Sequence, residues 1–297
     1  MKFLINKDFI NSALEFYSIV DNNYKQKCYD VIDEINNNDE FINRIKDIYN
    51  KLYIEENYNI RKLWKIKSKE ELFGKISSPY ITNVMLLLGY KIHEENIDKY
   101  NLDEYQIMKH KKRVKLALLN DIKIRGYDGI RISQMLWGAW FVNLRIIEVG
   151  RLQYELVENN PLNEEEYKKC IKIHIPAGEK LDINLVKESI KKSKEEIKKY
   201  FKIEEPEYFC SSWLLSKQIR RFIDDNSNIA LFYELFDVIE KGDATNDLLN
   251  FIFNLKECKD FSILPENTSL QKKIKKLLLK NIKINIGLGV LKNKEKK

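Results

Sequence analysis

Cysteine, histidine, proline and glycine are scarce in this chain of 297 residues, which contains 4 Cys, 3 His, 5 Pro and 10 Gly. The cysteines lie far apart and form no CxxC pair, so we expect neither a zinc site nor a redox disulfide, and no bound metal. Free cysteines at positions 28, 170, 210 and 258 fit a reducing compartment. The composition therefore predicts a cytoplasmic protein.

Long apolar runs are also absent. No stretch of about 18 apolar residues occurs, which is the length that a bilayer requires. The best candidate, MLWGAWFVNLRIIEVG, is interrupted by Asn143 and Arg145. The first residues carry Lys7 and Asp8 where a signal peptide needs an unbroken apolar core. We expect no membrane span and no membrane partner.

Three common site motifs are missing from the sequence. It contains no GxGxxG fingerprint and no GxxxxGK[ST] loop, which excludes the two commonest glycine-rich cradles for phosphate. It contains no GxSxG either, so a serine-hydrolase elbow is not supported.

Positive charge is concentrated at the C-terminal end. The net charge of the chain is +7, but residues 271–297 hold ten Lys and one acid, Glu295. That local excess of +9 leaves a net charge of −2 on the remaining residues. A protein that binds nucleic acid with its body is expected to spread Lys and Arg over one face, so we do not expect nucleic acid as a partner of this chain. The basic end is interpreted as a solvated face or as a rim that faces phosphates.

The distribution of turn-forming residues divides the chain in two. Residues 1–118 contain only Gly74, Gly89 and Pro79 of these residues. Apolar side chains in this part recur at steps of three and four, which is typical of helices, and the polar cluster 36–39 predicts a break between two of them. We expect an all-helical N-terminal domain over residues 1–118 and a second domain over 119–297.

The second part alternates strand and helix patterns. Residues 132–149 are predicted to form a helix, and Asp182 can cap another helix that carries an apolar stripe to Phe201. Residues 270–277 also have helical spacing. Strand patterns cover 151–157, 170–175, 208–215 and 282–288. The expected fold class is α+β or α/β, with a mixed sheet flanked by helices and an undetermined strand order.

His174 is the leading candidate for a catalytic base. It ends a predicted strand shortly before the Pro176–Gly178 turn, and a neutral imidazole there can take a proton from an amine or hydroxyl nucleophile. The alternative is a structural histidine that is hydrogen-bonded at a strand end. His93 and His110 lie in polar helical stretches and are expected to be solvated.

Glu155 is the second catalytic candidate. Strand alternation places it on the same face as Gln153, so the carboxylate can act as a base or hold a water molecule that does. The alternative is a solvated charge on an edge strand. Ser212 and Trp213 are candidates to line a pocket for the acyl group or the acceptor, with core packing as the alternative for the tryptophan.

Several strings in the second part, taken in order, resemble a known bacterial family. They are GRLQYEL from Gly150, HIPAGEKL from His174, CSSWLL from Cys210, SNIALF from Ser227 and LPENTSLQ from Leu264. This order is similar to acyltransferase-domain proteins that join a helical N-acyltransferase N-terminal domain to a GNAT-like C-terminal domain. The resemblance covers about residues 125–291.

The resemblance implies a GNAT-like sheet that moves an acyl group from acyl-coenzyme A to an amine or other small nucleophile by direct attack. It implies that the turn at Gly178, with Ala177 and Lys180, faces the coenzyme A co-substrate. Gln153, Ser212 and Trp213 would contact the small-molecule substrates. The family's usual Q/R-x-x-G-x-G/A loop is absent, and HIPAGEKL stands in a comparable position with one glycine. That departure keeps open the alternative of a non-catalytic binding or scaffold protein on a degenerate GNAT-like fold.

Overall fold

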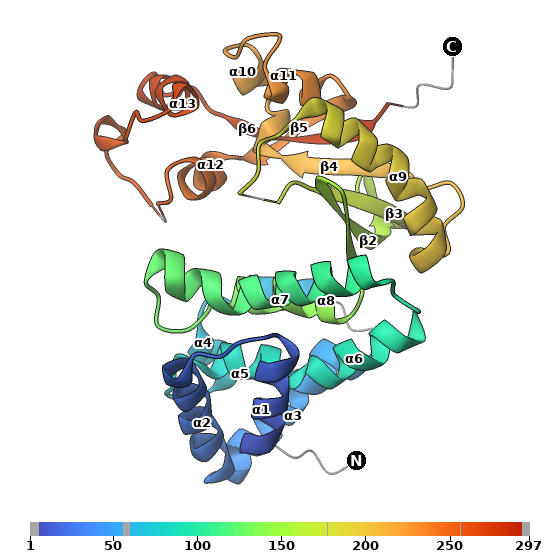
Figure 1. Ribbon diagram of the computed structural model, residues 1–297. Coiled ribbons are helices and arrows are strands. Elements are labelled where there is room, and N and C mark those ends of the chain that lie inside the picture. The colour runs from blue at the N-terminus through green and yellow to red at the C-terminus, as the bar shows by residue number, and fades with distance from the viewer. Residues whose placement is uncertain (1–5, 56–59, 177, 256, 293–297) are drawn as a thin grey trace. The chain divides into compact units, whose positions relative to one another are not determined.

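The computed structural model describes residues 6–55, 60–176, 178–255 and 257–292. The chain forms two compact units, Met1–Ile147 and Glu148–Lys297, which we call the helical unit and the sheet unit (Figure 1). A boundary after residue 118, as the composition predicts, falls inside the helix α7 (Glu104–Arg125). Each unit is described by itself.

The helical unit consists of helices joined by short turns. They are α1 (Lys7–Phe16), α2 (Asn22–Asn36), α3 (Asp39–Tyr49), η1 (Asn50–Ile54), η2 (Ile60–Lys65), α4 (Lys69–Phe73), α5 (Ile81–Leu88), α6 (Tyr90–Lys99), α7 and α8 (Ile132–Val142). Short polar side chains begin many of them: Asp21 caps α2, Asn38 caps α3 and Asp103 caps α7 by accepting from a backbone amide. Asn38 lies in the polar cluster 36–39, which confirms the predicted break.

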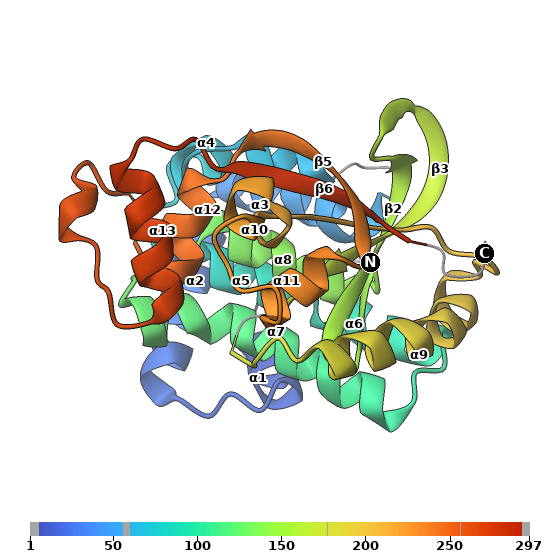
Figure 2. The same ribbon diagram turned by 90° about the horizontal axis from the view of Figure 1, so that it is seen from above.

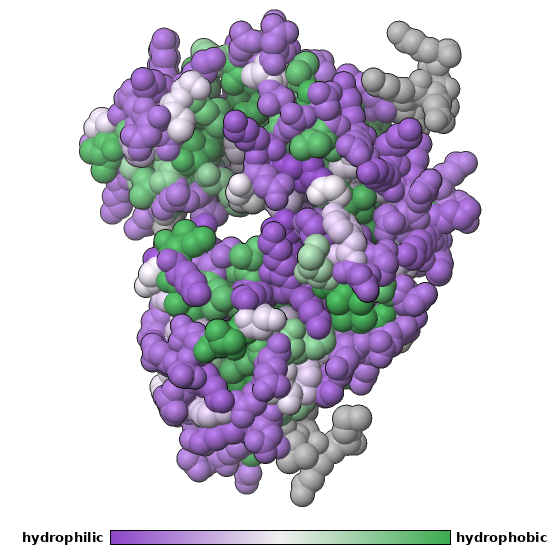
Figure 3. Space-filling model, viewed as in Figure 1, coloured by the Kyte–Doolittle hydropathy of each residue, from purple (hydrophilic) through white to green (hydrophobic). Residues whose placement is uncertain are grey.

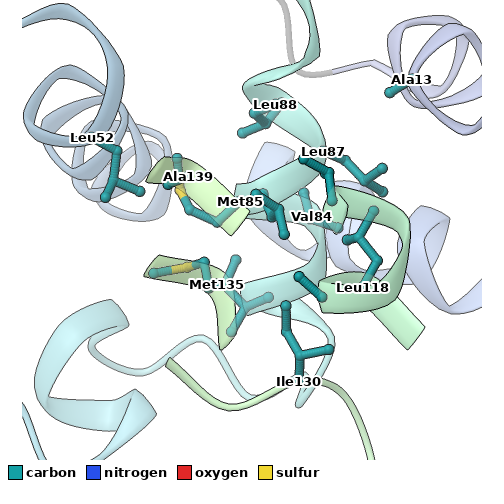
Figure 4. Packing of buried hydrophobic residues seen from close by; sticks show 14 of the residues in the cluster. Ala13, Leu52, Val84, Met85, Leu87, Leu88, Leu118, Ile130, Met135 and Ala139 are labelled. Carbon is teal, nitrogen blue, oxygen red and sulfur yellow. The ribbon is translucent and has the colours of Figure 1, made fainter. Parts of the chain in front are cut away.

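The core of the helical unit is built around α5, in which every residue is buried. Figure 4 shows Val84, Met85 and Leu87 of this helix among side chains from neighbouring helices, including Leu118 and Met135. The close packing needs a small residue at Gly138 of α8, where an added Cβ would lie 2.5 Å from a Leu86 methyl group. A helix that is buried all round, as α5 is, is stable only when it is surrounded by other elements.

Two histidines lie inside this core, contrary to the expectation that they are solvated. His93 and His110 are both fully buried, with ring centroids 5.8 Å apart. The Tyr17 hydroxyl lies 3.0 Å from Nδ1 of His93. Burial lowers the pKa of His93 well below its usual value, and the charges of His110 and Lys111 lower it further. Local polarity misled the prediction because the surrounding lysines point outward while the histidines point inward.

The buried His93 predicts a loss of stability in mild acid. Its pKa is lower in the folded chain than in the unfolded chain, so below about pH 6.5 the unfolded state binds the extra proton. The free energy of unfolding is expected to fall with decreasing pH, by up to about 1.4 kcal/mol per pH unit from this residue. Urea denaturation between pH 7.5 and 5 measures the slope. His93→Gln should flatten it, and an unchanged slope in this variant would rule out His93 as the cause.

The sheet unit contains a six-stranded mixed sheet in the order β1-β2-β3-β4-β6-β5. The strands are β1 (Ile146–Val149), β2 (Leu152–Asn160), β3 (Asn163–His174), β4 (Tyr208–Ser212), β5 (Phe236–Asp243) and β6 (Asn285–Leu291). Only β3 and β4 pair in parallel among the pairings that we describe. The helix predicted over 132–149 ends instead at Val142, because Leu144 takes a left-handed φ of 55° and β1 begins two residues later.

Helices flank this sheet on the chain segments between the strands. They are α9 (Ile183–Phe201), η3 (Trp213–Leu215), α10 (Lys217–Arg220), α11 (Asn228–Tyr233), α12 (Thr245–Ile252), η4 (Phe261–Ile263) and α13 (Ser269–Leu279). β5 and β6 lie side by side in the sheet, as Figure 2 shows, and the chain segment that connects them forms α12, η4 and α13. The expected class, a helical region followed by a mixed sheet with flanking helices, is confirmed.

A chain of hydroxyl groups fixes α9 to one face of the sheet. Tyr154 of β2 lies 2.8 Å from the Ser189 hydroxyl, which in turn donates to the Val149 carbonyl. Ser193, one turn further along α9, lies 2.8 Å from the Tyr208 hydroxyl of β4. Burial raises the pKa of Tyr208 to about 12, so this phenol stays neutral and available for hydrogen bonding. Odd-numbered residues of β2 consequently lie on the opposite face.

Hydrophilic residues cover most of the surface seen in Figure 3. Within the described ranges, no helix has both the length and the apolar character that a membrane crossing requires. The lysines of α13 lie mostly on its outer side, and Ile274, Leu277 and Leu278 on its inner side are buried. The basic end of the chain is thus a helix and a strand of the sheet unit.

Candidate active site

The two parallel strands at the centre of the sheet pair over only part of their length. β3 and β4 pair only at Ile171 with Tyr208 and at Lys172 with Phe209. Further along, β4 pairs on its other side with β6, up to Ser212 opposite Gly287. The facing edges of residues 173–174 and 210–212 therefore carry backbone groups that are not used in pairing between these two strands. We call this stretch the opening between β3 and β4, and strand edges of this kind can hydrogen-bond an extended ligand.

Beside this opening, polar side chains follow one face of the sheet. In the register of β2 and β3, Gln153 lies opposite His174 and Glu155 lies opposite Lys172. These four side chains lie on the face opposite to Tyr154 and α9. Strand alternation in the sequence predicted this shared face for Gln153 and Glu155. The tertiary structure adds the two residues of β3.

His174 and Glu155 form a direct contact within that set. Nε2 of His174 lies 2.7 Å from Oε2 of Glu155. The glutamate side chain is 3% exposed and the histidine side chain is 18% exposed. A buried carboxylate that holds a partly accessible imidazole is the arrangement that orients a general base. The two residues that the sequence proposed separately for this role are thus brought together.

A second buried pair extends the polar row to β1. The side-chain amide of Gln153 donates from Nε2 to Oε2 of Glu148, at 2.8 Å. Both residues are 2% exposed. Glu148 was not among the predicted site residues because its segment has the pattern of a helix end. The signal was an acid inside the apolar run Ile146–Val149, directly before the Gly150 turn.

The turn after β3 is held in place by Arg151. Its Nε donates to the Lys180 carbonyl at 2.8 Å, and one terminal nitrogen donates to the Glu179 carbonyl at 2.7 Å. Gly178 has a φ of 96°, and no atom lies within 4 Å of the position its Cβ would take. Lys180 is exposed. Ala177, the third residue proposed for this turn, lies outside the described residues.

The first amides of α9 are bonded within the chain. Asp182 accepts from the backbone N–H groups of Asn184 and Leu185 at 2.8 and 3.1 Å. The N–H of Ile183 donates to the Asn228 side chain at 3.4 Å. A helix N-terminus often binds a phosphate group through such amides, but here a carboxylate of the chain takes that position.

Ser212 and Trp213 lie where β4 ends. The Ser212 hydroxyl accepts from the Leu214 amide at 3.2 Å and so caps η3. The Trp213 ring packs against the apolar cluster formed by α12 and α13. The strand predicted over 208–215 therefore stops at Ser212, where the hydroxyl cap turns the chain into η3.

A metal site is not formed by the residues in the described part of the chain, where no group of three or more His, Cys, Asp or Glu side chains is placed to hold an ion. All four cysteines are free thiols. Burial raises the pKa of both Cys28 and Cys210 to about 12, so neither is a ready nucleophile.

Comparison with known structures finds similar folds in solved proteins that are named as acyltransferases. A solved structure named as an acyltransferase in complex with decanoyl-CoA is similar over 95% of this chain and 98% of its own, with a TM-score of 0.68 and 14% identity. A second, named as an acyltransferase in complex with CoA and 10C-teicoplanin, is similar over 74% of this chain and 68% of its own, with a TM-score of 0.63 and 16% identity. At these identities the likeness shows a shared fold.

Sequence comparison gives a match over most of the sheet unit. Residues 146–291 match the family model of the GNAT-like C-terminal domain. No protein of curated function matches the chain.

Proposed function

We propose that this protein is an acyltransferase that moves an acyl group from acyl-coenzyme A to an amine or other small nucleophile by direct attack. The observation that carries the proposal is the Glu155–His174 pair beside the opening between β3 and β4. The match to the GNAT-like C-terminal domain and the shared fold with acyltransferases support it.

The opening between the strands suits the extended arm of a thioester donor. Its unpaired backbone N–H and C=O groups can hydrogen-bond the amide groups of such an arm, as an added strand would. A backbone N–H that points at the thioester carbonyl would also stabilise the negative charge that develops there during attack. The turn at Gly178 and Lys180 is the proposed contact for the coenzyme A end of the donor, with Ser212 and Trp213 at the acyl or acceptor side.

His174 is the proposed base. An ionised carboxylate only accepts hydrogen bonds, so beside ionised Glu155 the Nε2 atom of His174 carries a hydrogen and donates it. The neutral ring then has its lone pair on Nδ1. As the nucleophile bonds to the thioester carbon, Nδ1 takes its proton. The C–S bond then breaks, and the imidazolium returns the proton to the departing thiolate, which leaves as the free thiol. Glu155 stabilises the imidazolium that forms.

A panel of acyl-coenzyme A thioesters tests the proposal. Octanoyl and decanoyl thioesters are suitable first probes because proteins of this fold are named with them bound. We expect binding by calorimetry and release of coenzyme A, detected by mass spectrometry, when a primary amine is added. If no thioester binds and no coenzyme A is released, the enzyme interpretation is wrong.

A non-catalytic binding protein on the same fold is the second candidate. The observation that favours it is the Asp182 carboxylate at the N-terminus of α9, in a turn without the glycine-rich loop. This alternative predicts that thioesters bind without being consumed. Cytoplasmic location and the identities of the small-molecule donor and acceptor are likewise proposals.

A further inference from the structure

We infer that the acyl donor is delivered by an acidic acyl carrier protein that docks on the lysine face of α13. The lysine face consists of four exposed side chains, Lys272, Lys273 and Lys276 of α13 and Lys280 directly after it. The inference rests on the proposed function and names the carrier of its acyl group. Such a carrier holds the acyl group as a thioester on a pantetheine arm like that of coenzyme A. After transfer to the acceptor, the carrier leaves with a free thiol.

The lysine face is one continuous stripe. An α-helix turns roughly 100° per residue, so its four positions fall within an arc of about 100° and extend over about 12 Å of the helix axis. Ile274, Leu277 and Leu278 are buried on the opposite side of the helix and hold it to the rest of the sheet unit. The stripe is therefore presented to solvent on a fixed support.

Few acids balance the charge of this stripe. Residues 269–284 contain six Lys and no Asp or Glu. Glu266 forms its salt bridge with Lys275, at 2.9 Å, and acts on Lys272 only as a second charge. The helix α9 also carries six Lys, but it contains three Glu, and Lys192 pairs with Glu188. The lysine face of α13 thus keeps a positive potential that attracts an acidic partner.

The topology places α13 at the end of the sheet where the opening lies. β3 and β4 are parallel, and β4 and β5 both pair antiparallel with β6. The carboxyl ends of β3, β4 and β5 therefore lie at the same end as the start of β6, into which α13 leads (Figure 1). Gly287 of β6 is paired with Ser212, and the adjacent Trp213 ring packs against the cluster formed by α12 and α13. A carrier docked on α13 stands at the end from which its arm can enter the opening.

The same region matches a nucleotide carrier less well. The N-terminus of α9 is the common position for a phosphate group, and here it holds the Asp182 carboxylate. A pyrophosphate needs one compact cradle of donors. A lysine stripe about 12 Å long instead meets several carboxylates along another helix.

The apolar residues around the stripe favour a protein over a membrane surface. A helix that lies in a membrane interface inserts its apolar face, but the apolar face of α13 is buried within the sheet unit. Leu279, 50% exposed, lies beside the lysine face, and Ile263, 74% exposed, lies on η4, which packs against α13. Exposed apolar side chains next to charged ones are typical of a surface that docks another protein.

The experiment compares two donors that carry the same acyl group. One is decanoyl-CoA, and the other is a purified acidic acyl carrier protein loaded with the decanoyl group; benzylamine is the acceptor. We expect the KM for the loaded carrier to be at least tenfold lower than that for decanoyl-CoA. It should rise between about 50 and 300 mM salt, because salt screens the charges. Calorimetry with the loaded carrier alone measures docking without any acceptor.

The double variant Lys273→Glu, Lys276→Glu should raise the KM for the loaded carrier at least tenfold and leave the KM for decanoyl-CoA unchanged. Lys273→Gln with Lys276→Gln removes the charges without reversing them and should give a smaller rise of the same kind. Thermal melting by circular dichroism establishes that each variant folds. The matched control is Lys191→Glu with Lys194→Glu on α9, where both lysines are exposed. It makes the same change in net charge and should alter neither KM.

Equal KM values for the two donors would overturn the inference, and so would an equal loss for both donors in the α13 variants, although acyl transfer itself would stand. Tighter binding of a DNA duplex or of anionic lipid vesicles than of the loaded carrier would assign the lysine face to that ligand and also overturn it. If neither donor binds and neither gives up its acyl group, the proposed function is contradicted instead.

Discussion

Replacing His174 with alanine is expected to lower kcat/KM for acyl transfer about 100-fold to 10,000-fold, which is the usual contribution of a general base. The physical reason is that the amine must lose a proton as it attacks, and we assign to the His174 ring the role of accepting that proton on Nδ1. Binding of the donor thioester should be unchanged because the backbone edges of β3 and β4 remain. Steady-state kinetics and calorimetry measure the two effects separately.

Glu155→Gln tests the other half of the pair. The amide keeps the size of the carboxylate but can donate as well as accept, so it no longer fixes the hydrogen on Nε2 of His174. We expect a smaller loss than for His174→Ala, and no further loss when the two changes are combined, because residues that act as a unit are not additive. A His174→Ala enzyme with the wild-type rate would remove His174 from the mechanism and leave the fold unaffected.

Replacing Gly287 with alanine is expected to destabilise the sheet unit by about 3 kcal/mol, at the upper end of what overpacking costs. An added Cβ would lie 2.0 Å from the Leu215 carbonyl oxygen, which is a backbone atom that cannot rotate away. Either β6 or η3 must move, and Gly287 is paired with Ser212 at the mouth of the opening between β3 and β4. Donor binding should therefore weaken as well. Urea denaturation followed by circular dichroism measures the stability.

Gly242→Ala is the control for this prediction. Gly242 has a φ of 41°, and nothing lies within 4 Å of its added Cβ, so alanine there meets backbone strain without a collision. The expected cost is about 1 kcal/mol. Equal losses for the two variants would mean that the collision at Gly287 is relieved by a small shift, and the predicted effect on donor binding would then be wrong.

Many of the helices and strands could be predicted from local sequence patterns. The apolar stripe of α9 and its Asp182 cap, and the alternation in β3, β4 and β6, each depend on residues a few positions apart. The prediction failed where neighbours in sequence point in opposite directions in space. β1 was merged into the preceding helix because Ile146–Val149 is buried on both faces and continues the apolar run of α8, and the burial of His93 was hidden by the lysines and acids around it.

Several residues of the candidate site could be predicted from the sequence, but their arrangement in space could not. His174 and Glu155 were selected on strand alternation and on the turn that follows, but 19 positions separate them in the chain. Their contact depends on the register between β2 and β3, which local sequence does not state. The contact of Gln153 with Glu148 depends on the same sheet, because it joins a side chain of β2 to one of β1.

The scarcity of cysteine, histidine and glycine-rich motifs already excluded several kinds of site, and the helical and strand periodicities determined the fold class. These conclusions depend on composition and on short-range geometry, which a sequence contains in full. The short pairing of β3 with β4 and the polar row from Glu148 to His174 were decided by the tertiary structure alone. Each depends on which strands lie side by side and in what register, and local sequence does not determine either.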